Sequence, residues 1–366
     1  MKITLIAGAR PNFMKIAPII QAIHQLNSAS DKQKISYRLI HTGQHYDKNM
    51  SDTFFEELGI PLPNANLGCG GGTQAEQTAA IMVALEKELL DNPSDLLVVV
   101  GDVTSTMACS IVAKKLNTKV AHVEAGIRSF DLTMPEEINR MVTDSITDYF
   151  FTTSEFANEN LRKAGVDENQ IFFVGNVMID TLLKNLPRLR KPAVFDELKL
   201  QEKNYLVLTM HRPANVDEAE KLKLLMNEIT SNVRGLPILF PIHPRTARIF
   251  HDLDISAPNL HIVDPMGYLE FNYLVKHAKG VITDSGGITE ETTVMGIPCI
   301  TLRDNTERPE TCSVGTNELI GINPLAISPA LDKLFAGEWK KGAVPELWDG
   351  KAARRIVNHL SKFVFI

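Results

Sequence analysis

The chain has 366 residues, of which 44% are hydrophobic and 22% are charged, with a formal net charge of −6. This composition is ordinary for a globular protein of about two domains, and its acidic balance argues against nucleic acid or an anionic membrane as a partner. No apolar stretch reaches membrane-spanning length, and four cysteines without CxxC or metal spacing favour reduced thiols and a cytoplasmic location.

In the first half of the chain, short apolar runs alternate with longer amphipathic segments. Strands are expected at residues 2–8, 35–42, 95–102, 119–125, 148–154 and 170–175. Helices are expected at residues 13–26, 74–91, 105–117, 136–147 and 155–164. Because apolar runs separated by helices are typical of buried parallel strands, residues 1–186 are predicted to form a Rossmann-like domain.

The pattern breaks at residues 186–203, which are charged and contain two prolines, as is typical of a linker. Further strands are expected at residues 205–211, 236–243, 259–265, 279–285 and 297–303. Residues 187–349 are therefore predicted to form a second Rossmann-like domain, and the helical segment 350–366 to pack back on the first. The predicted fold class is α/β, with two parallel sheets and a cleft between the domains.

Polar residues follow several predicted strands, at the sheet edge where ligands bind in open parallel sheets. Arg10 and Lys15 follow the first strand in GARPNFMK, and Asp102 follows the third in GDVTST. The alternative for these residues is a solvated loop or a turn-forming aspartate. Glu124 ends the apolar strand in HVEAGIRS, so its carboxylate needs a partner or a ligand.

The sequence MPEEINR opens a helix with Glu136, Glu137 and Arg140 in its first turns. Acids at a helix start commonly only complement the helix dipole, so a structural role is the alternative to a catalytic one. With Asp102 and Glu124, Glu136 would complete a set of three carboxylates suited to proton transfer.

The second half offers groups that suit an anionic ligand. His211 in TMHRPAN and His243 in PIHPRT each end a predicted strand, and Arg308 lies in the loop RDNTERPE. In TDSGGITEE, two glycines after Ser285 leave the backbone N–H groups at a helix start open to phosphate oxygens. The alternatives are an N-cap serine without a ligand and a self-neutralising surface loop.

Taken in order, these motifs resemble those of the non-hydrolysing UDP-N-acetylglucosamine 2-epimerases. The resemblance extends from residue 1 to about residue 321 and rests on GARPNFMK, TGQHYD, GDVTSTMA, HVEAGIRS, MPEEINR, MHRPANVD, PIHPRT, TDSGGITEE, RDNTERPE and GTNELIG. It implies a GT-B architecture with the active site in the interdomain cleft, a homodimer, a UDP-sugar substrate, and no metal or nicotinamide cofactor.

The resemblance also implies roles for individual residues. The catalytic residues expected from it are Asp102, Glu124, Glu136 and His211. The substrate-binding residues expected are Arg10, Lys15, Arg140, His243, Phe271, Ser285, Gly286, Gly287, Glu291 and Arg308. Among these, the Ser-Gly-Gly turn would seat the diphosphate and Glu291 would accept the ribose hydroxyls.

The implied activity is reversible epimerisation of UDP-N-acetylglucosamine at C2, by elimination of UDP to a 2-acetamidoglucal and re-addition. The sequence leaves open which carboxylate is the acid and which is the base. Because SFDLTMPEE has the spacing of relatives that act on 2,3-diacetamido uronic acid nucleotides, such a substrate is the first alternative. A GT-B glycosyltransferase and a non-catalytic nucleotide-sugar sensor are the others, and neither requires all three acids.

Overall fold

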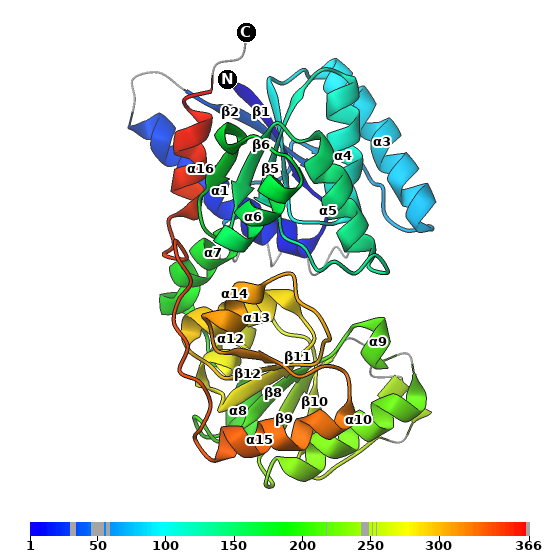
Figure 1. Cartoon of the computed structure of the whole chain (residues 1–366), viewed down its shortest axis with the longest axis vertical. Helices are drawn as coiled ribbons and strands as arrows, with labels where there is room; N and C mark the ends of the chain where they lie inside the picture. The colour runs from blue at the N-terminus through cyan, green and yellow to red at the C-terminus, as the bar shows by residue number, and fades with distance from the viewer. Residues whose placement is uncertain are drawn as a thin grey trace. The chain divides into compact units, whose positions relative to one another are not determined.

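The chain folds into two compact units. The computed structural model describes residues 1–29, 34–44, 55, 59–216, 218–242, 249–250, 252–253 and 255–363. The first unit comprises Met1–Lys184 and Glu346–Ile366, and the second comprises Asn185–Pro345 (Figure 1).

The first unit is built on a seven-stranded parallel sheet. Its strands are β1 (Lys2–Ala7), β2 (Ser36–His41), β3 (Ala65–Asn66), β4 (Leu96–Val100), β5 (Lys119–Ala125), β6 (Tyr149–Thr152) and β7 (Ile171–Phe173). They lie in the order β3-β2-β1-β4-β5-β6-β7, so the strand order reverses between β1 and β4. Ligands of doubly wound sheets bind at the carboxyl ends of the strands beside such a reversal.

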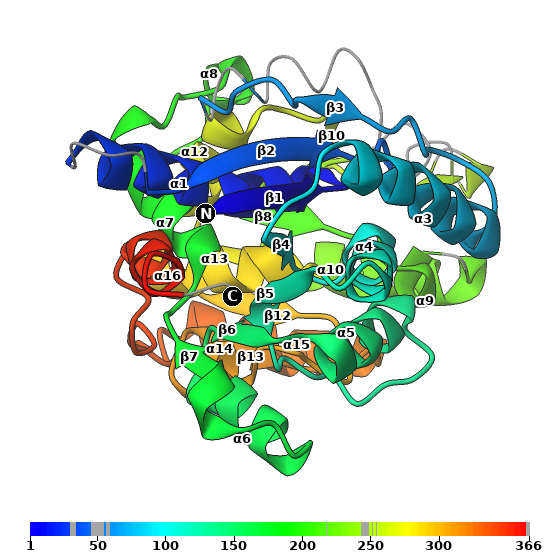
Figure 2. The same ribbon diagram turned by 90° about the horizontal axis from the view of Figure 1, so that it is seen from above.

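Helices cover both faces of this sheet. They are α1 (Arg10–Ser28), α3 (Gln74–Asp91), α4 (Thr104–Lys115), α5 (Pro135–Ile146), α6 (Glu155–Lys163), α7 (Val177–Asn185) and α16 (Ala352–Leu360), with a 3-10 turn at Glu168–Gln170. Figure 2 shows α1 and α16 on one face and α3, α4 and α5 on the other. On the second face, Leu85 of α3 and Val112 of α4 pack against Leu97 and Val99 of β4.

The C-terminal segment is anchored to the first unit by polar contacts as well as by packing. The carboxylate of Asp180 in α7 caps α16, because it accepts hydrogen bonds from the backbone N–H groups of Ala352 at 3.0 Å and Ala353 at 2.7 Å. The buried indole of Trp348 donates to the Thr153 carbonyl at 2.9 Å. These contacts join segments that are more than a hundred residues apart in the chain.

The second unit repeats the same sheet topology with six parallel strands. They are β8 (Leu206–Thr209), β9 (Ile238–Pro241), β10 (Leu260–Val263), β11 (Gly280–Thr283), β12 (Cys299–Thr301) and β13 (Asn317–Leu319). The order β10-β9-β8-β11-β12-β13 reverses between β8 and β11. At that reversal the hydroxyls of Thr209 and Thr283 are hydrogen-bonded to each other at 2.7 Å.

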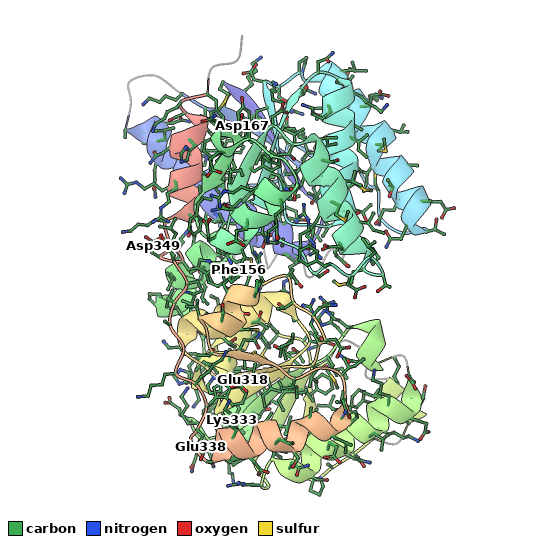
Figure 3. The ribbon with its side chains drawn as sticks, viewed as in Figure 1. Phe156, Asp167, Glu318, Lys333, Glu338 and Asp349 are labelled. Carbon is green, nitrogen blue, oxygen red and sulfur yellow. The ribbon has the colours of Figure 1, made fainter. Side chains whose placement is uncertain are left out.

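The helices of the second unit also cover both faces. They are α8 (Ala193–Glu197), α9 (Pro213–Val216), α10 (Ala219–Asn232), α12 (Tyr268–His277), α13 (Gly286–Met295), α14 (Pro309–Ser313) and α15 (Ile327–Phe335), with 3-10 turns at Leu186–Arg188 and Pro324–Ala326. Leu206 and Leu208 join one core cluster, while Val207 joins the other, as the two-residue period of a strand requires. Lys333 of α15 forms an ion pair with Glu318 of β13 (Figure 3).

The predicted alternation of strands and helices is confirmed, with three differences. The short edge strands β3 and β13 were not expected, because each has only two or three residues. Residues 186–203, expected to be a linker, instead hold α8 and bury Phe195 and Leu200 in a core cluster of the second unit.

In the part of the chain that the structure describes, no helix is both long enough and apolar enough to cross a membrane.

Candidate active site

In the first unit, the turn after β1 is tied to the end of β4 by a single buried side chain. The side-chain oxygen of Asn12 accepts from the backbone N–H groups of Gly8 at 3.0 Å and Ala9 at 2.9 Å. Its amide nitrogen donates to the Val100 carbonyl at 2.9 Å. Asn12 therefore fixes the start of α1, on which Arg10 and Lys15 lie, relative to the β4 end that leads to Asp102.

Glu124 lies at a break in the β5–β6 pairing, a β-bulge near the carboxyl end of β5. The β5–β6 register shifts between Val123 and Ala125, and Glu124 has a φ of 79°, a left-handed conformation that side-chain-bearing residues rarely adopt. Its carboxylate is buried and forms an ion pair with Lys15 of α1. A strained residue held by the surrounding structure is a common feature of functional sites.

Gly101 makes room for this ion pair. It has a φ of +67°, and a Cβ at this position would lie 2.8 Å from the Lys15 ammonium nitrogen and 3.3 Å from a Glu124 carboxylate oxygen. A larger residue would therefore push the pair apart while also straining the backbone.

Asp102 follows Gly101 and is held by Arg140 of α5. The Arg140 guanidinium is buried, and it donates to Asp102 at 2.6 Å and also pairs with Glu137 at 2.8 Å. Glu137 in turn accepts from the backbone N–H groups of Ser129 and Phe130, each at 3.0 Å. The structure thus gives Arg140 contacts that orient Asp102, and gives Glu137 contacts that hold the loop before α5.

Glu136 has a different environment from its neighbour Glu137. It lies in the first turn of α5 and is exposed, whereas Glu137 is fully buried. Asp102 is intermediate, since 26% of its side chain is accessible. The three predicted carboxylates therefore cover a range from buried to exposed at one edge of the sheet.

In the second unit, His211 is oriented by a buried aspartate. Its Nδ1 lies 2.9 Å from the Asp284 carboxylate, while 62% of its side chain is accessible. Asp284 also accepts from the backbone N–H of Arg212 at 2.9 Å and from the Asn215 amide at 3.1 Å. Burial alone would raise the pKa of Asp284, but the hydrogen bonds from His211, Arg212 and Asn215 hold it below its usual value. An ionised Asp284 fixes the ring of His211 with Nε2 directed away from it.

The Ser-Gly-Gly turn forms the start of α13, as the sequence suggests. Ser285 is the N-cap residue and Gly286 is the first helical residue. The Ser285 side chain makes no capping hydrogen bond, so it leaves the first backbone N–H groups of the helix without a side-chain cap. Because the N-terminus of a helix favours negative charge, this turn can bind a phosphate.

Two adjacent glutamates of α13 have separate partners. Glu290 forms an ion pair with Arg308, and each of these side chains is only 3% exposed. Glu291 accepts a hydrogen bond from the Tyr268 hydroxyl at 2.8 Å, and both residues are buried. One acid thus holds a cation next to α13, and the other is held by an aromatic residue of α12.

Phe271 and His243 are two further residues predicted to bind the substrate. Phe271 lies on α12, where it is partly buried against a core cluster of the second unit. His243 falls outside the described residues. Among the described residues, no group of three or more His, Cys, Asp or Glu side chains is arranged to hold a metal ion.

The sequence analysis did not predict several residues that hold the site in place. Asn12, Asp284, Glu290 and Tyr268 each hold a predicted site residue or its loop. Asn12, Asp284 and Glu290 lie within the quoted motifs GARPNFMK and TDSGGITEE, so their position was a usable signal. Tyr268 carries no such signal, because its contact with Glu291 crosses 23 residues.

The two sheet edges differ in chemistry. The first unit places two carboxylates, Glu124 and Asp102, beside the cations Lys15 and Arg140. The second unit offers an oriented histidine, a helix start without a side-chain cap and the Arg308 region. Proton transfer suits the first set, and binding of a phosphorylated group suits the second.

Comparison with known proteins identifies close relatives over the whole chain. A family model described as UDP-N-acetylglucosamine 2-epimerase matches residues 27–361. The UDP-N-acetylglucosamine 2-epimerase of Methanocaldococcus jannaschii is 42% identical, with 99% of each chain covered. The UDP-2,3-diacetamido-2,3-dideoxy-D-glucuronate 2-epimerase of Pseudomonas aeruginosa is 36% identical, with 99% of this chain and 100% of that protein covered.

Solved structures give the same result for the fold. The M. jannaschii UDP-GlcNAc 2-epimerase in complex with UDP-GlcNAc and UDP matches with a TM-score of 0.89 at 42% identity, covering 99% of this chain and 100% of that one. The Neisseria meningitidis UDP-GlcNAc 2-epimerase bound to UDP-GlcNAc matches with a TM-score of 0.88 at 28% identity and the same coverage. The predicted fold class, two Rossmann-like α/β units of the GT-B type, is thereby confirmed.

Proposed function

Because the chain belongs to the UDP-N-acetylglucosamine 2-epimerase family, we propose that it interconverts UDP-N-acetylglucosamine and UDP-N-acetylmannosamine. The reaction inverts C2 by elimination of UDP to a 2-acetamidoglucal, followed by re-addition. The observation that carries the proposal is Glu124, a buried and strained carboxylate paired with Lys15 at the carboxyl edge of the first sheet.

The second unit would bind UDP. The diphosphate is assigned to the backbone N–H groups of the Ser285–Gly287 turn, with Arg308 and the outward Nε2 of His211 adding donors. Phe271, His243 and the ribose-binding Glu291 complete the proposed UDP-binding set. These donors matter most when the C1–O bond breaks, because charge then accumulates on the departing diphosphate.

The first unit would carry out proton transfer on the sugar. A proton on C2 of a neutral hexosamine is very weakly acidic, but loss of UDP gives C1 oxocarbenium character and acidifies C2. One carboxylate among Asp102, Glu124 and Glu136 then accepts that proton, leaving the glucal double bond between C1 and C2. Another carboxylate returns a proton to the opposite face while UDP re-adds at C1. Positioned acids and bases contribute about 10²–10⁴-fold to such steps.

The cations near these acids support a specific arrangement of the sugar. Arg10 lies at the start of α1 and Lys15 one turn later, where the latter holds Glu124. Arg140 fixes the direction of Asp102, so we assign it a positioning role in addition to the substrate contact expected from the resemblance. The resemblance further supports a cytoplasmic homodimer that needs neither a metal nor a nicotinamide cofactor.

A second candidate substrate is a UDP-2,3-diacetamido-2,3-dideoxy uronic acid. It is favoured by the 36% identity with the Pseudomonas aeruginosa enzyme over nearly the whole chain. The chemistry at C2 would be the same, and only the groups at C3 and C5 of the sugar would differ.

The test is incubation of the purified protein with UDP-N-acetylglucosamine in D₂O, without added metal, followed by proton NMR. UDP-N-acetylmannosamine carrying deuterium at C2 is the expected product. Deuteration and epimerisation of the uronic acid nucleotide alone would select the second candidate. Absence of both products with both nucleotides would overturn the proposal.

A further inference from the structure

We propose that Asp144 and His122 are positioning residues for the C2 proton transfer. They hold the β5 bulge that carries Glu124 and tie it to the turn that carries Asp102. This inference rests on the proposed function, since it assigns a role within that reaction. Neither residue was singled out by the sequence motifs as a catalytic or binding group.

Asp144 holds the chain on both sides of Glu124. One of its carboxylate oxygens lies 2.7 Å from Nδ1 of His122, two residues before Glu124. The other accepts from the backbone N–H of Gly126 at 3.0 Å, two residues after Glu124, and from Arg128 at 2.7 Å. A single buried carboxylate of α5 therefore fixes both ends of the bulge.

His122 extends this network to the neighbouring strand. Its ring is fully buried, and its Nε2 lies 2.8 Å from the carbonyl oxygen of Gly101, the residue before Asp102. A carbonyl oxygen can only accept, so Nε2 carries a proton. The ring thus links the bulge at Glu124 to the turn that presents Asp102.

The Nδ1 atom of His122 faces the carboxylate of Asp144. Burial alone would raise the pKa of Asp144, but His122 and Arg128 hold it below its usual value, so Asp144 is ionised and accepts. Both ring nitrogens of His122 therefore face oxygen partners, which fixes the ring in one orientation. A buried network in which every member is satisfied is rigid, and loss of one member disrupts the others.

The strain at Glu124 explains why such a network is needed. A side-chain-bearing residue with a φ of 79° tends to relax unless its neighbours are held. Relaxation of the bulge would move the Glu124 carboxylate relative to the sugar. A displacement of about 1 Å at a reacting group can cost about 10²-fold in rate.

The experiment compares Asp144→Ala with Asp144→Asn in the full-length protein. Alanine removes the hydrogen bonds to His122 and Gly126 on both sides of the bulge. We therefore expect kcat for epimerisation to fall about 10²-fold. Asparagine can keep the hydrogen bonds, with its oxygen on Gly126 and Arg128 and its nitrogen donating to Nδ1 of a neutral His122. It is expected to recover at least about tenfold of the lost rate. The UDP dissociation constant, set by the second unit, should change by no more than about twofold in either variant.

Asp180→Ala is the matched control. Asp180 is a buried aspartate of the same unit that also accepts two backbone N–H groups, but it caps α16 instead of holding β5. It should lower the melting temperature and leave kcat unchanged. If Asp144→Ala does not fold, His122→Gln replaces it, because glutamine can reach only one of the two acceptors and should also lower kcat at constant UDP affinity.

The outcomes separate the two proposals. A wild-type protein that neither epimerises nor exchanges deuterium at C2 overturns the proposed function, and the positioning role with it. An active wild type, with Asp144→Ala or His122→Gln retaining full kcat, overturns the positioning role alone. Equal kcat losses in Asp144→Ala and Asp180→Ala would also overturn it, because the effect would then follow stability instead of position.

Discussion

The two units share one sheet topology but differ in how they hold the groups proposed for catalysis. In the first unit, Lys15, Glu124 and Arg140 are buried and paired with one another or with Asp102. In the second unit, His211 is 62% exposed and is held from behind by the buried Asp284. Buried charges act strongly on a reacting group, whereas exposed donors can close on an incoming anion. This difference is the reason for assigning proton chemistry to the first unit and UDP binding to the second.

Backbone strain separates the units in the same way. Glu124 has a positive φ at the carboxyl end of β5. In the described part of the second unit, the non-glycine residues with positive φ are Lys199, Lys203 and Arg234, which all precede strands. Among the described residues, a non-glycine residue with positive φ thus lies at the carboxyl end of a strand only in the unit to which we assign the chemistry.

The largest effect is expected from neutralising Glu124. Glu124→Gln removes a carboxylate to which we assign proton transfer, and it breaks the ion pair with Lys15. We expect kcat for epimerisation to fall about 10²–10⁴-fold, measured by NMR from the rate of product formation in D₂O. Glu159→Gln, an exposed glutamate of α6, is the control and should retain full activity. A loss of less than about tenfold in Glu124→Gln would remove Glu124 from the catalytic set.

The next effect concerns the stability of the first unit alone. Burial raises the pKa of Asp180 from 3.8 to about 6. A raised carboxyl pKa favours the protonated form in the folded state. In the unfolded chain the Asp180 carboxyl has its ordinary pKa of 3.8. The stabilisation from the raised pKa is fully present below pH 3.8 and is lost as the pH rises through about 6. The difference between the folded and unfolded pKa values corresponds to about 3 kcal/mol of stability.

Asp180→Asn should abolish this pH dependence. The free energy of unfolding, relative to that of the variant, should fall by about 2.4 kcal/mol in the wild type between pH 4 and pH 7. A Trp339→Phe background leaves Trp348 as the only tryptophan, so its fluorescence reports on the first unit. Parallel pH profiles for the wild type and Asp180→Asn would show that Asp180 is not the titrating group.

A smaller effect is expected in the second unit from Glu290→Gln. The substitution removes the ion pair between Glu290 and the buried Arg308 guanidinium, which weakens the hold on the direction of the guanidinium. We expect UDP affinity to fall about tenfold, measured by titration calorimetry. Glu318→Gln, at an ion pair on β13, is the control for charge loss in the same unit. Tighter UDP binding by Glu290→Gln would contradict this assignment, because Glu290 would then compete with the diphosphate for Arg308.

The smallest effect is expected from Tyr268→Phe. This change removes one hydrogen bond of 2.8 Å to Glu291 and keeps the aromatic ring. One such bond contributes about 0.5–1.5 kcal/mol, so UDP affinity should weaken by about two- to tenfold. Tyr273→Phe, on the same helix, is the matched control. Equal effects in both variants would mean that the helix, and not Glu291, is being perturbed.

Much of the fold was predictable because its signals are local. Apolar β-branched runs such as those around Val98 and Ile282 mark buried strands, and an ionisable residue at the end of one marks Glu124 as unusual. The prediction of a linker at residues 186–203 was wrong. The prolines and charged residues there outweigh Phe195 and Leu200 in the sequence pattern, and the burial of these two residues depends on tertiary packing. The two short edge strands carry too few residues to show a period.

The arrangement of the site was less predictable because its contacts are distant in sequence. The Lys15–Glu124 pair spans 109 residues and the His211–Asp284 contact spans 73. Residue 124 has a positive φ but is a glutamate, so the sequence does not indicate this conformation as a glycine would. A pattern along the chain shows which residues at strand ends are polar, but it does not show which of them form ion pairs or hydrogen bonds with each other.

The division of labour between the units is tested most directly by titrating UDP into Glu124→Gln and Glu290→Gln beside the wild type. We predict that Glu124→Gln binds UDP within about twofold of the wild type although it has lost its epimerase activity. Glu290→Gln should bind UDP about tenfold more weakly. If Glu124→Gln weakened UDP binding as much as Glu290→Gln does, the assignment of proton chemistry and UDP binding to separate units would be contradicted.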